Sequence, residues 1–363
     1  MNSPSISFSP LLKEFVPWSW NNRQRVYGKH LNGLIPVLSI DLGSKCTLCS
    51  CLYCDTPVNQ PDSGKLKFDE IRRLIVELVG YGLEWIYICG LGEPSQDENF
   101  IPLINLAKEN QLNLVFFTNG LGYSVKTRKL LYQSNVYPIV KCDSMNDQIF
   151  DQLLKKKGGG RKVKDLLGSL VEAKSELDFN SGTSLAISLI PTKINKDSFL
   201  DVVTYCINSS IFPVIGELEK VNSAATNVSL LELDHNEKRL LVRELEELLL
   251  GPYIRPICPG VFVSLHVGFD GDVLLGQNTG FSCVWFLQEN PQTHAIGNIR
   301  NDPLTKIVGW IREYRLEYLT NARERALGVN TIFSAGGGTV PSTWINEYER
   351  SVLSMCYGMS VSN

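Results

Sequence analysis

Six short apolar runs alternate with helical patterns between residues 34 and 218, and this alternation limits the possible folds most strongly. The runs are rich in Val, Ile and Leu, which is typical of a parallel sheet covered by helices. The predicted strands are Leu34–Asp41, Trp85–Gly90, Leu112–Thr118, Val136–Asp143, Ser184–Ile190 and Phe212–Leu218. The predicted helices between them are Phe68–Gly80, Phe100–Glu109, Asp147–Lys156, Lys162–Leu177 and Phe199–Asn208. Six such units predict an α/β fold, a partial (β/α)6 TIM-like barrel, with a doubly wound open sheet as the alternative.

The pattern changes after a predicted amphipathic helix over His235–Leu249. Val261–Leu275 predicts a hairpin with its turn at Asp270-Gly271, because this dipeptide suits the positive φ angles of a tight turn. A further helix is predicted over Pro303–Tyr314. We therefore expect three parts, namely an N-terminal cap over residues 1–33, the partial barrel over 34–230 and a smaller C-terminal α+β domain over 231–363.

Charge and hydropathy exclude several classes of partner. A net charge of -3 argues against a protein that binds nucleic acid by charge alone. The one basic cluster, Lys155–Lys157 with Arg161 and Lys162, is typical of a solvated helix end. No apolar run approaches the ~20 residues that span a bilayer, and Met1–Pro4 begins no secretory signal. We expect a cytoplasmic protein that binds neither a membrane nor nucleic acid.

Ten cysteines need an explanation other than disulfide bonds, which a reducing cytosol disfavours. Four of them, Cys46, Cys49, Cys51 and Cys54, fall within nine residues directly after the first predicted strand. In barrel-like α/β folds, loops at the carboxyl ends of strands build the active site. Four thiolates could close a tetrahedral zinc site, whereas three could hold three corners of a [4Fe–4S] cube and leave one iron open. The four histidines form no HxH or HxxH pair, so a histidine-built metal site has no support.

Motifs after the second and third strands favour the cube. Cys89-Gly-Leu-Gly-Glu-Pro94 follows the second strand, and Thr118-Asn119-Gly120 follows the third. Together with Cys51-Leu-Tyr-Cys54, these segments make the chain resemble the radical S-adenosylmethionine (SAM) enzymes, specifically the group with SPASM or twitch auxiliary domains. That group has three cysteines with an aromatic residue before the last, then GGEP, and often TNG. Its partial barrel of six β/α units agrees with the strand count.

The cysteine spacing departs from the usual CxxxCxxC of this family. Four residues separate Cys46 from Cys51, and Thr47 stands where a cysteine is usual. We expect Cys46, Cys51 and Cys54 to be the ligands of the SAM cluster, because Cys49 lies too near Cys51 to hold a different iron comfortably. Cys49 in place of Cys46 is the alternative.

The resemblance also implies which residues would bind SAM. Leu91 replaces the first glycine of GGEP, but Gly92 is retained and would let the backbone approach the SAM amino group. Glu93 would hold the ammonium, and Tyr53 would lie against the adenine. The other expected SAM-binding residues are Thr118, Asn119, Lys141 and Ser188. Lys141 would pair with the SAM carboxylate, with an ordinary surface lysine as the alternative. Glu217 and Glu219 are weaker candidates for binding a cationic or hydroxyl-rich substrate.

The C-terminal region resembles SPASM and twitch domains, in which a cysteine precedes a hairpin and further cysteines follow. Cys258 precedes the predicted hairpin, and Ala295–Ile299 resembles the GNI segment found next in this group. Gly276 stands where the second cysteine is expected. We therefore expect Cys258, Cys283 and Cys356 to be the ligands of a possible auxiliary [4Fe–4S] cluster. The alternative is a domain that has kept the fold and lost the metal.

The function implied by the resemblance is reductive cleavage of SAM to methionine and a 5′-deoxyadenosyl radical, which abstracts hydrogen from a substrate. That substrate would be a small molecule or a peptide in a biosynthetic pathway, modified by oxidation, cross-linking or epimerisation. No N-terminal domain of ~80–90 residues is present to bind a peptide leader, which favours a small molecule slightly. The expected partner is an electron donor such as flavodoxin or ferredoxin. A zinc-stabilised binding module and a radical SAM enzyme acting on tRNA are the alternatives.

Overall fold

The computed structural model describes residues 9–43, 46, 48, 51–54, 64–88, 90, 92–177, 182–216, 218, 222–251, 264–275 and 295–313. Within these ranges, a nine-stranded sheet has the order β11-β10-β9-β2-β3-β4-β5-β7-β8. Its parallel strands include β2 (Val37–Ile40), β3 (Trp85–Ile88), β4 (Asn113–Thr118), β5 (Val136–Lys141), β7 (Ala186–Leu189) and β8 (Phe212–Ile215). Each lies inside a strand predicted from the sequence, and the predicted α/β class is confirmed.

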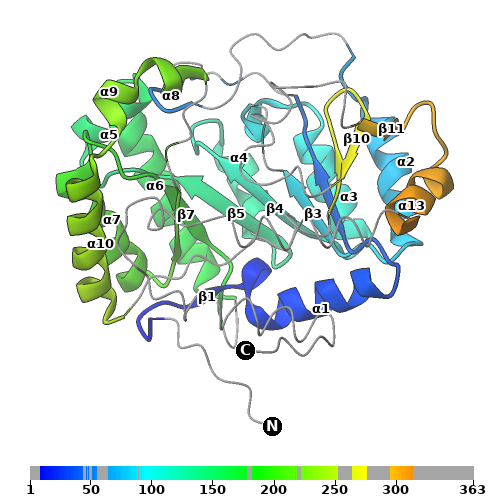
Figure 1. Cartoon of the computed structure of the whole chain (residues 1–363), viewed down its shortest axis with the longest axis horizontal. Helices are drawn as coiled ribbons and strands as arrows, with labels where there is room; N and C mark the ends of the chain where they lie inside the picture. The colour runs from blue at the N-terminus through cyan, green and yellow to red at the C-terminus, as the bar shows by residue number, and fades with distance from the viewer. Residues whose placement is uncertain are drawn as a thin grey trace.

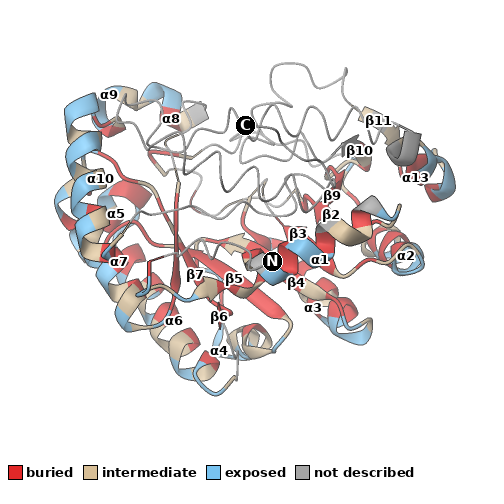
Figure 2. Cartoon of the chain, turned by 60° about the horizontal axis from the view of Figure 1, so that its bottom comes forward, coloured by how far each residue is buried: buried red, intermediate tan, exposed pale blue. Residues whose placement is uncertain are grey.

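Helices cover the outer side of these strands (Figure 1). They are α2 (Phe68–Val79), α3 (Phe100–Glu109), α5 (Asp147–Leu154), α6 (Gly159–Lys174) and α7 (Phe199–Asn208). In α2 the buried residues Ile71, Leu74, Ile75 and Leu78 recur at helical spacing and share one apolar cluster with Leu38 of β2. Burying each such side chain stabilises the fold by about 1.5–3 kcal/mol. Figure 2 shows the result, a buried sheet behind helices whose outward faces are exposed.

The opposite face of the strands packs on the N-terminal segment. Val37 and Trp85 belong to a second buried cluster that also contains Phe15, Trp18 and Val26. Phe15 lies on β1 (Glu14–Phe15), which pairs in parallel with β6 (Gly182–Thr183), and Val26 lies on α1 (Trp20–Leu31). The rings of Phe15 and Trp18 meet edge to face with centroids 5.3 Å apart. Apolar side chains from the start of the chain therefore fill the barrel interior at the end of the sheet where α1 lies (Figure 1).

The predicted hairpin is present and extends the barrel sheet. β9 (Ser264–Val267) pairs in parallel with β2, and β10 (Asp272–Leu275) pairs antiparallel with β9. β11 (Ala295–Asn298) follows on the outer edge, and α13 (Leu304–Glu313) comes after it. The helix α10 (His235–Leu249) has the predicted bounds. The sheet thus crosses the boundary expected between residues 230 and 231, and that division into domains stays a prediction.

Several helices were not predicted. They are α1, in the segment expected only to form a cap, and the shorter α4 (Val125–Arg128), α8 (Asn222–Thr226) and α9 (Val228–Leu231). The 3-10 turns are Val16–Trp18, Pro94–Gln96, Lys129–Tyr132 and Lys196–Ser198. None of the helices within the described ranges combines the length and apolar character that crossing a bilayer requires.

Lys174 is a buried cation at the end of α6. Its Nζ donates hydrogen bonds to the carbonyl oxygens of Val136 at 2.6 Å and Gln133 at 3.1 Å. Burial lowers the pKa of Lys174 to about 7. The side chain therefore joins the end of α6 to the start of β5 but carries an electrostatic cost when protonated.

The free energy of unfolding should depend on pH through Lys174. Between the lowered pKa of about 7 and the unfolded value of 10.5, the unfolded chain binds a proton that the folded chain does not. Stability from this group therefore rises with pH across that window, by up to about 1.4 kcal/mol per pH unit, and is lost as pH falls to 7. Urea unfolding of the wild type and Lys174→Met at pH 7 and pH 9 measures this. A constant difference between the two proteins would contradict the expectation.

Candidate functional site

Three thiols lie in the loop that follows β2. Cys46, Cys51 and Cys54 are half-buried free cysteines, and the amide of Cys54 donates to the Cys51 carbonyl at 3.2 Å. Burial raises the pKa of the Cys51 thiol, and the neighbouring thiols of Cys54 and Cys46 raise it further. Such an effect on Cys51 requires the sulfur atoms of Cys46 and Cys54 to lie near it. The structure therefore brings the three expected ligands together, whereas Cys49 lies outside the described residues.

The arrangement of these thiols bears on the kind of metal group that would fit. Within the described ranges, no three Cys, His, Asp or Glu side chains are placed so that they could hold one metal ion. A zinc site needs all of its ligands on a single ion, whereas each cysteine of a [4Fe–4S] cube binds a different iron. Cys49, the fourth thiol of a zinc site, lies outside the described residues, so the choice between a zinc ion and a [4Fe–4S] cube stays a prediction.

The Gly92-Glu93 turn after β3 forms the second part of the site. Gly92 has a φ of 108°, a backbone conformation that residues other than glycine rarely adopt. The Glu93 carboxylate is 2% exposed and accepts from the Thr118 hydroxyl at 2.6 Å, the Asn119 amide at 2.7 Å and the Ser95 amide at 3.2 Å. Burial raises the pKa of Glu93, and these hydrogen bonds oppose the rise. A carboxylate offers about four acceptor positions, so this one keeps room for a further donor.

Asn119 connects the Glu93 turn to the cysteine loop. Its side-chain Nδ2 lies 3.5 Å from the sulfur of Cys46, while its backbone amide bonds to Glu93. Its Oδ1 accepts from the Leu121 amide at 2.9 Å, which fixes the orientation of the side chain. Cys46, Glu93 and Asn119 follow three neighbouring parallel strands, so their meeting is a direct result of the strand order. Thr118 and Asn119, expected as SAM contacts, orient Glu93 in this structure.

Lys141 at the end of β5, the strand that pairs with β4, forms a further part of the site. Its Nζ lies 2.8 Å from Oδ1 of Asp143 and 4.7 Å from the centroid of the Tyr53 ring. The Asp143 side chain is fully buried and also accepts from the Ile190 amide at 2.7 Å. The Lys141 side chain is 18% exposed, so its interpretation as an ordinary surface lysine is wrong. Its expected pairing with the SAM carboxylate stays a prediction.

Tyr53 and Ser188 are both neighbours of Lys141. Tyr53 is 9% exposed, and burial together with the Asp143 carboxylate raises the pKa of its phenol. Ser188 on β7 is the register partner of Lys141 on β5, so the two half-buried side chains share one face of the sheet. The contact between Tyr53 and adenine, and that between Ser188 and SAM, stay predictions.

A buried polar set on β2 and β9 was not predicted. Nε2 of His266 lies 3.1 Å from Oδ2 of Asp41, and its Nδ1 lies 3.0 Å from the Ser39 hydroxyl. All three side chains are at most 1% exposed. A search for paired histidines misses this set, because the partners of His266 are a serine and an aspartate on another strand. The sequence signal that could have found this set is the alternation of Ser39 and Asp41 with apolar residues along a buried segment.

Several expected site residues lie outside the described residues. They are the candidate auxiliary ligands Cys258, Cys283 and Cys356 and the candidate substrate contacts Glu217 and Glu219. The auxiliary cluster and the acidic substrate contacts therefore stay predictions.

Comparison with known proteins gives one curated relative at low identity. No protein-family model matches the chain. The chain is 26% identical over 210 residues to SkfB, the sporulation killing factor maturation protein of Bacillus subtilis strain 168. The aligned stretch covers 57% of this chain and 48% of SkfB, so the chain spans about half the length of this relative.

Solved structures share the fold. SuiB of Streptococcus suis bound to its precursor peptide SuiA aligns with a TM-score of 0.58 at 17% identity, over 79% of this chain and 68% of SuiB. SuiB bound to S-adenosylmethionine aligns with a TM-score of 0.56 at 16% identity, over 79% and 67%. The protein anSMEcpe with bound AdoMet aligns with a TM-score of 0.54 at 15% identity, over 74% and 79%. The chain therefore has the fold of these proteins, and the fold that the resemblance implied is confirmed.

Proposed function

We propose that this chain is a radical SAM enzyme that modifies a peptide in a biosynthetic pathway. The observation that carries the proposal is the connection of the thiol loop to the buried Glu93 turn through Asn119, where β2, β3 and β4 end. When bound, a reduced [4Fe–4S] cluster supplies the electron that cleaves SAM into methionine and a 5′-deoxyadenosyl radical, which takes a hydrogen atom from the substrate.

The residues of the chain bind and orient these groups. Cys46, Cys51 and Cys54 would hold three irons and leave the fourth for the amino and carboxylate groups of SAM. Glu93 would accept a hydrogen bond from the SAM amino group at the acceptor position that its own chain leaves open. Thr118 and Asn119 keep the Glu93 carboxylate in position through their bonds to it. Gly92 would let the backbone approach the same amino group.

Lys141 and Tyr53 would also contact SAM. The Asp143 carboxylate pairs with Lys141, and the Tyr53 ring lies beside the ammonium of that lysine. These contacts position the Lys141 ammonium, which would bind the SAM carboxylate at little cost in side-chain ordering. Tyr53 contributes an apolar surface for the adenine, and Ser188 contributes a hydroxyl on the same face as Lys141.

A peptide is favoured over a small molecule as substrate. SuiB is bound to a precursor peptide in its solved structure, and SkfB is named for the maturation of a killing factor. This support outweighs the slight preference for a small molecule that the sequence suggested. Reductive cleavage of SAM requires a one-electron donor for the cluster, and a flavodoxin or ferredoxin in the cytoplasm would supply it.

Anaerobic purification and reconstitution with iron and sulfide tests the proposal. We expect brown protein with about four irons per chain, or about eight if an auxiliary cluster is present. Addition of SAM and dithionite should release 5′-deoxyadenosine slowly even without substrate. Colourless protein that binds one zinc and cleaves no SAM would overturn the proposal.

The substrate class is tested separately with the reconstituted enzyme. Precursor peptides encoded beside its gene are incubated with the enzyme, SAM and reductant, and mass spectrometry follows their hydrogen content. We expect a peptide to lose hydrogens and to accelerate release of 5′-deoxyadenosine. Acceleration by unmodified tRNA, with no change in any peptide, would contradict the substrate proposal while leaving the SAM chemistry intact.

A further inference from the structure

The loop that carries the three expected ligands, called here the cysteine loop, runs from Asp41, its first end, to Leu66, its second end. Both ends contact the C-terminal hairpin at or beside its turn. At the first end, the Asp41 amide donates to the Val267 carbonyl of β9 at 3.0 Å. At the second end, the Leu66 amide donates to the Phe269 carbonyl at 2.7 Å. The two ends are far apart along the chain, and closing a long loop costs conformational entropy. Contacts with one hairpin turn offset that cost.

Gly43 fits closely against the same turn. Its φ of +68° suits glycine, and a Cβ added there would lie 2.7 Å from Cβ of Phe269. That separation is far below ordinary van der Waals contact, so a larger residue would push the loop away from the hairpin. The first end of the loop therefore packs directly on the turn residue that receives the second end.

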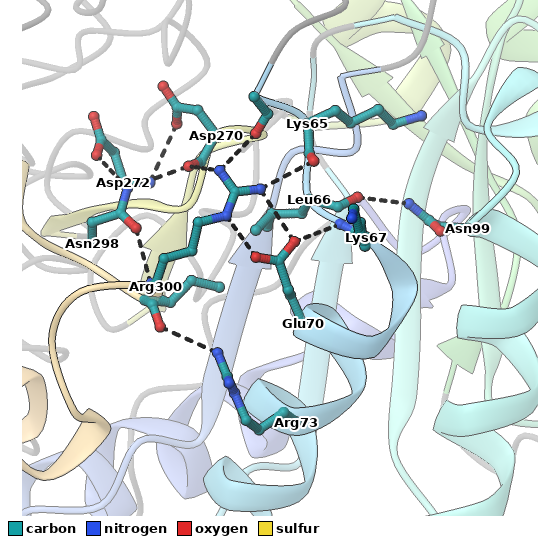
Figure 3. A network of polar contacts seen from close by, with 12 residues as sticks. Lys65, Leu66, Lys67, Glu70, Arg73, Asn99, Asp270, Asp272, Asn298 and Arg300 are labelled. Carbon is teal, nitrogen blue, oxygen red and sulfur yellow. Dashed lines mark hydrogen bonds and ion pairs between the residues drawn. The ribbon is translucent and has the colours of Figure 1, made fainter.

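Arg300, in the turn after β11, binds the second end of the cysteine loop through its side chain (Figure 3). Its guanidinium donates to the carbonyl oxygens of Gly64 at 2.8 Å, Lys65 at 3.0 Å and Asp270 at 3.0 Å. It also donates to Oε1 of Glu70 at 2.6 Å and to Oε2 at 3.1 Å. These five bonds match the five N–H groups of an arginine. One side chain thus joins the end of the cysteine loop, the hairpin turn and the start of α2.

The surroundings of Arg300 hold it in place. Its backbone amide donates to Oδ1 of Asn298 at 2.9 Å, and Nδ2 of Asn298 donates to Oδ1 of Asp272 at 2.8 Å. The ion pair with Arg300 lowers the pKa of Glu70 to about 2, so the carboxylate stays charged at neutral pH. On the far side of the loop end, Lys65 pairs with Asp97 at 2.7 Å. The Arg300 contacts are therefore part of a connected and charged arrangement.

We propose that the hairpin turn and Arg300 form a clamp that holds the cysteine loop ready to bind its cluster, with Arg300 as a positioning residue. The inference rests on the proposed function, because the loop carries the three expected ligands. Within the described residues, the clamp contacts the cysteine loop through Asp41 and Gly43 at its first end and through Gly64, Lys65 and Leu66 at its second. It gives the C-terminal region a role in the SAM cluster that does not depend on any cluster of its own.

The test compares Arg300→Gln with Arg73→Gln. Arg73 is the matched control, because its Nη2 donates to the Ile299 carbonyl at 3.5 Å beside Arg300 and it has no hydrogen bond to the described residues of the cysteine loop. Iron loss from reconstituted protein to a chelator is followed by the decay of its brown absorbance. We expect Arg300→Gln to lose iron about tenfold faster or more, in line with other residues that support metal ligands, and Arg73→Gln to match the wild type.

A second readout needs no cluster. Hydrogen exchange of apo protein should show the Leu66 amide exchanging faster in Arg300→Gln than in the wild type or Arg73→Gln.

Arg300→Lys keeps the charge but not the fork of donors, so its iron loss should fall between those of the wild type and Arg300→Gln. Gly43→Ala disturbs the other end of the loop and should also speed iron loss. If Arg300→Gln does not fold, iron loss from Gly43→Ala and Arg300→Lys tests the clamp instead.

Failure of the clamp and failure of the proposed function would give different results. Iron retention and Leu66 exchange at wild-type values in Arg300→Gln, or in Arg300→Lys and Gly43→Ala together, would overturn the clamp. Wild-type protein that takes up no iron would instead overturn the proposed function. Faster exchange at Leu66 with unchanged iron retention would reduce Arg300 to a local structural contact and would also reject the clamp.

Discussion

Cys54→Ala should reduce reductive SAM cleavage to background. The thiol is half-buried, and its amide bonds to the Cys51 carbonyl, so the two residues form one tight turn of the loop. Losing a residue that merely supports a metal ligand costs about 10–100-fold in affinity or activity, and losing a ligand should cost more than about 100-fold. Cys46→Ala and Cys51→Ala should behave alike. Release of 5′-deoxyadenosine from anaerobically reconstituted protein with SAM and dithionite measures the effect.

Cys49→Ala is the matched control in the same loop. We expect it to retain iron and to cleave SAM at close to the wild-type rate, because the ligand set is complete without it. Loss of activity in Cys49→Ala together with retained activity in Cys46→Ala would show that Cys49 replaces Cys46. The iron content of each variant separates a lost cluster from a misplaced SAM.

Asp143→Ala should lower the free energy of unfolding by about 3 kcal/mol or more. The carboxylate is fully buried and bonds both to Lys141 at 2.8 Å and to the Ile190 amide at 2.7 Å. Removing one partner of a buried ion pair leaves the other charge uncompensated, which costs about 3–5 kcal/mol. The partial exposure of Lys141 puts the expected value at the lower end. Urea unfolding of the apo protein measures it without any contribution from SAM.

Asp143→Asn and a double variant separate charge from hydrogen bonding. Asp143→Asn keeps an oxygen for the Ile190 amide, so it should destabilise less than Asp143→Ala. Adding Lys141→Met to Asp143→Asn removes the uncompensated ammonium and should recover part of the loss. If Asp143→Ala unfolds within about 0.5 kcal/mol of the wild type, as most exposed substitutions do, the pair has no role in stability.

The regular elements could be predicted because local spacing determines them. The helices Phe100–Glu109, Phe199–Asn208 and His235–Leu249 have the bounds expected from their apolar periodicity. The turn at Gly271 follows from its dipeptide, and its φ is 87°. Elements of four or five residues such as Val125–Arg128 have no room for a period and were missed.

The contacts within the site could be predicted only in part. The motif order placed Cys46, Glu93 and Asn119 at the ends of neighbouring strands, and the structure joins them. The partners of His266 depend on β9 lying beside β2, a pairing of residues 227 positions apart. Arg300 likewise reaches Glu70 across 230 positions. Such pairings follow from register and sheet order, which no local pattern in one sequence specifies.

The place of β9 beside β2 has a consequence for synthesis of the chain. His266 and Ser39 are 227 positions apart, so the ribosome makes the thiol loop long before its hairpin support. At ~5–20 residues per second, that interval is about 11–45 s. During this time the nascent thiols have no closed loop around them. The clamp on the cysteine loop is therefore complete only after the hairpin has been made, and we expect a product cut short before codon 264 to lose iron faster than the whole chain.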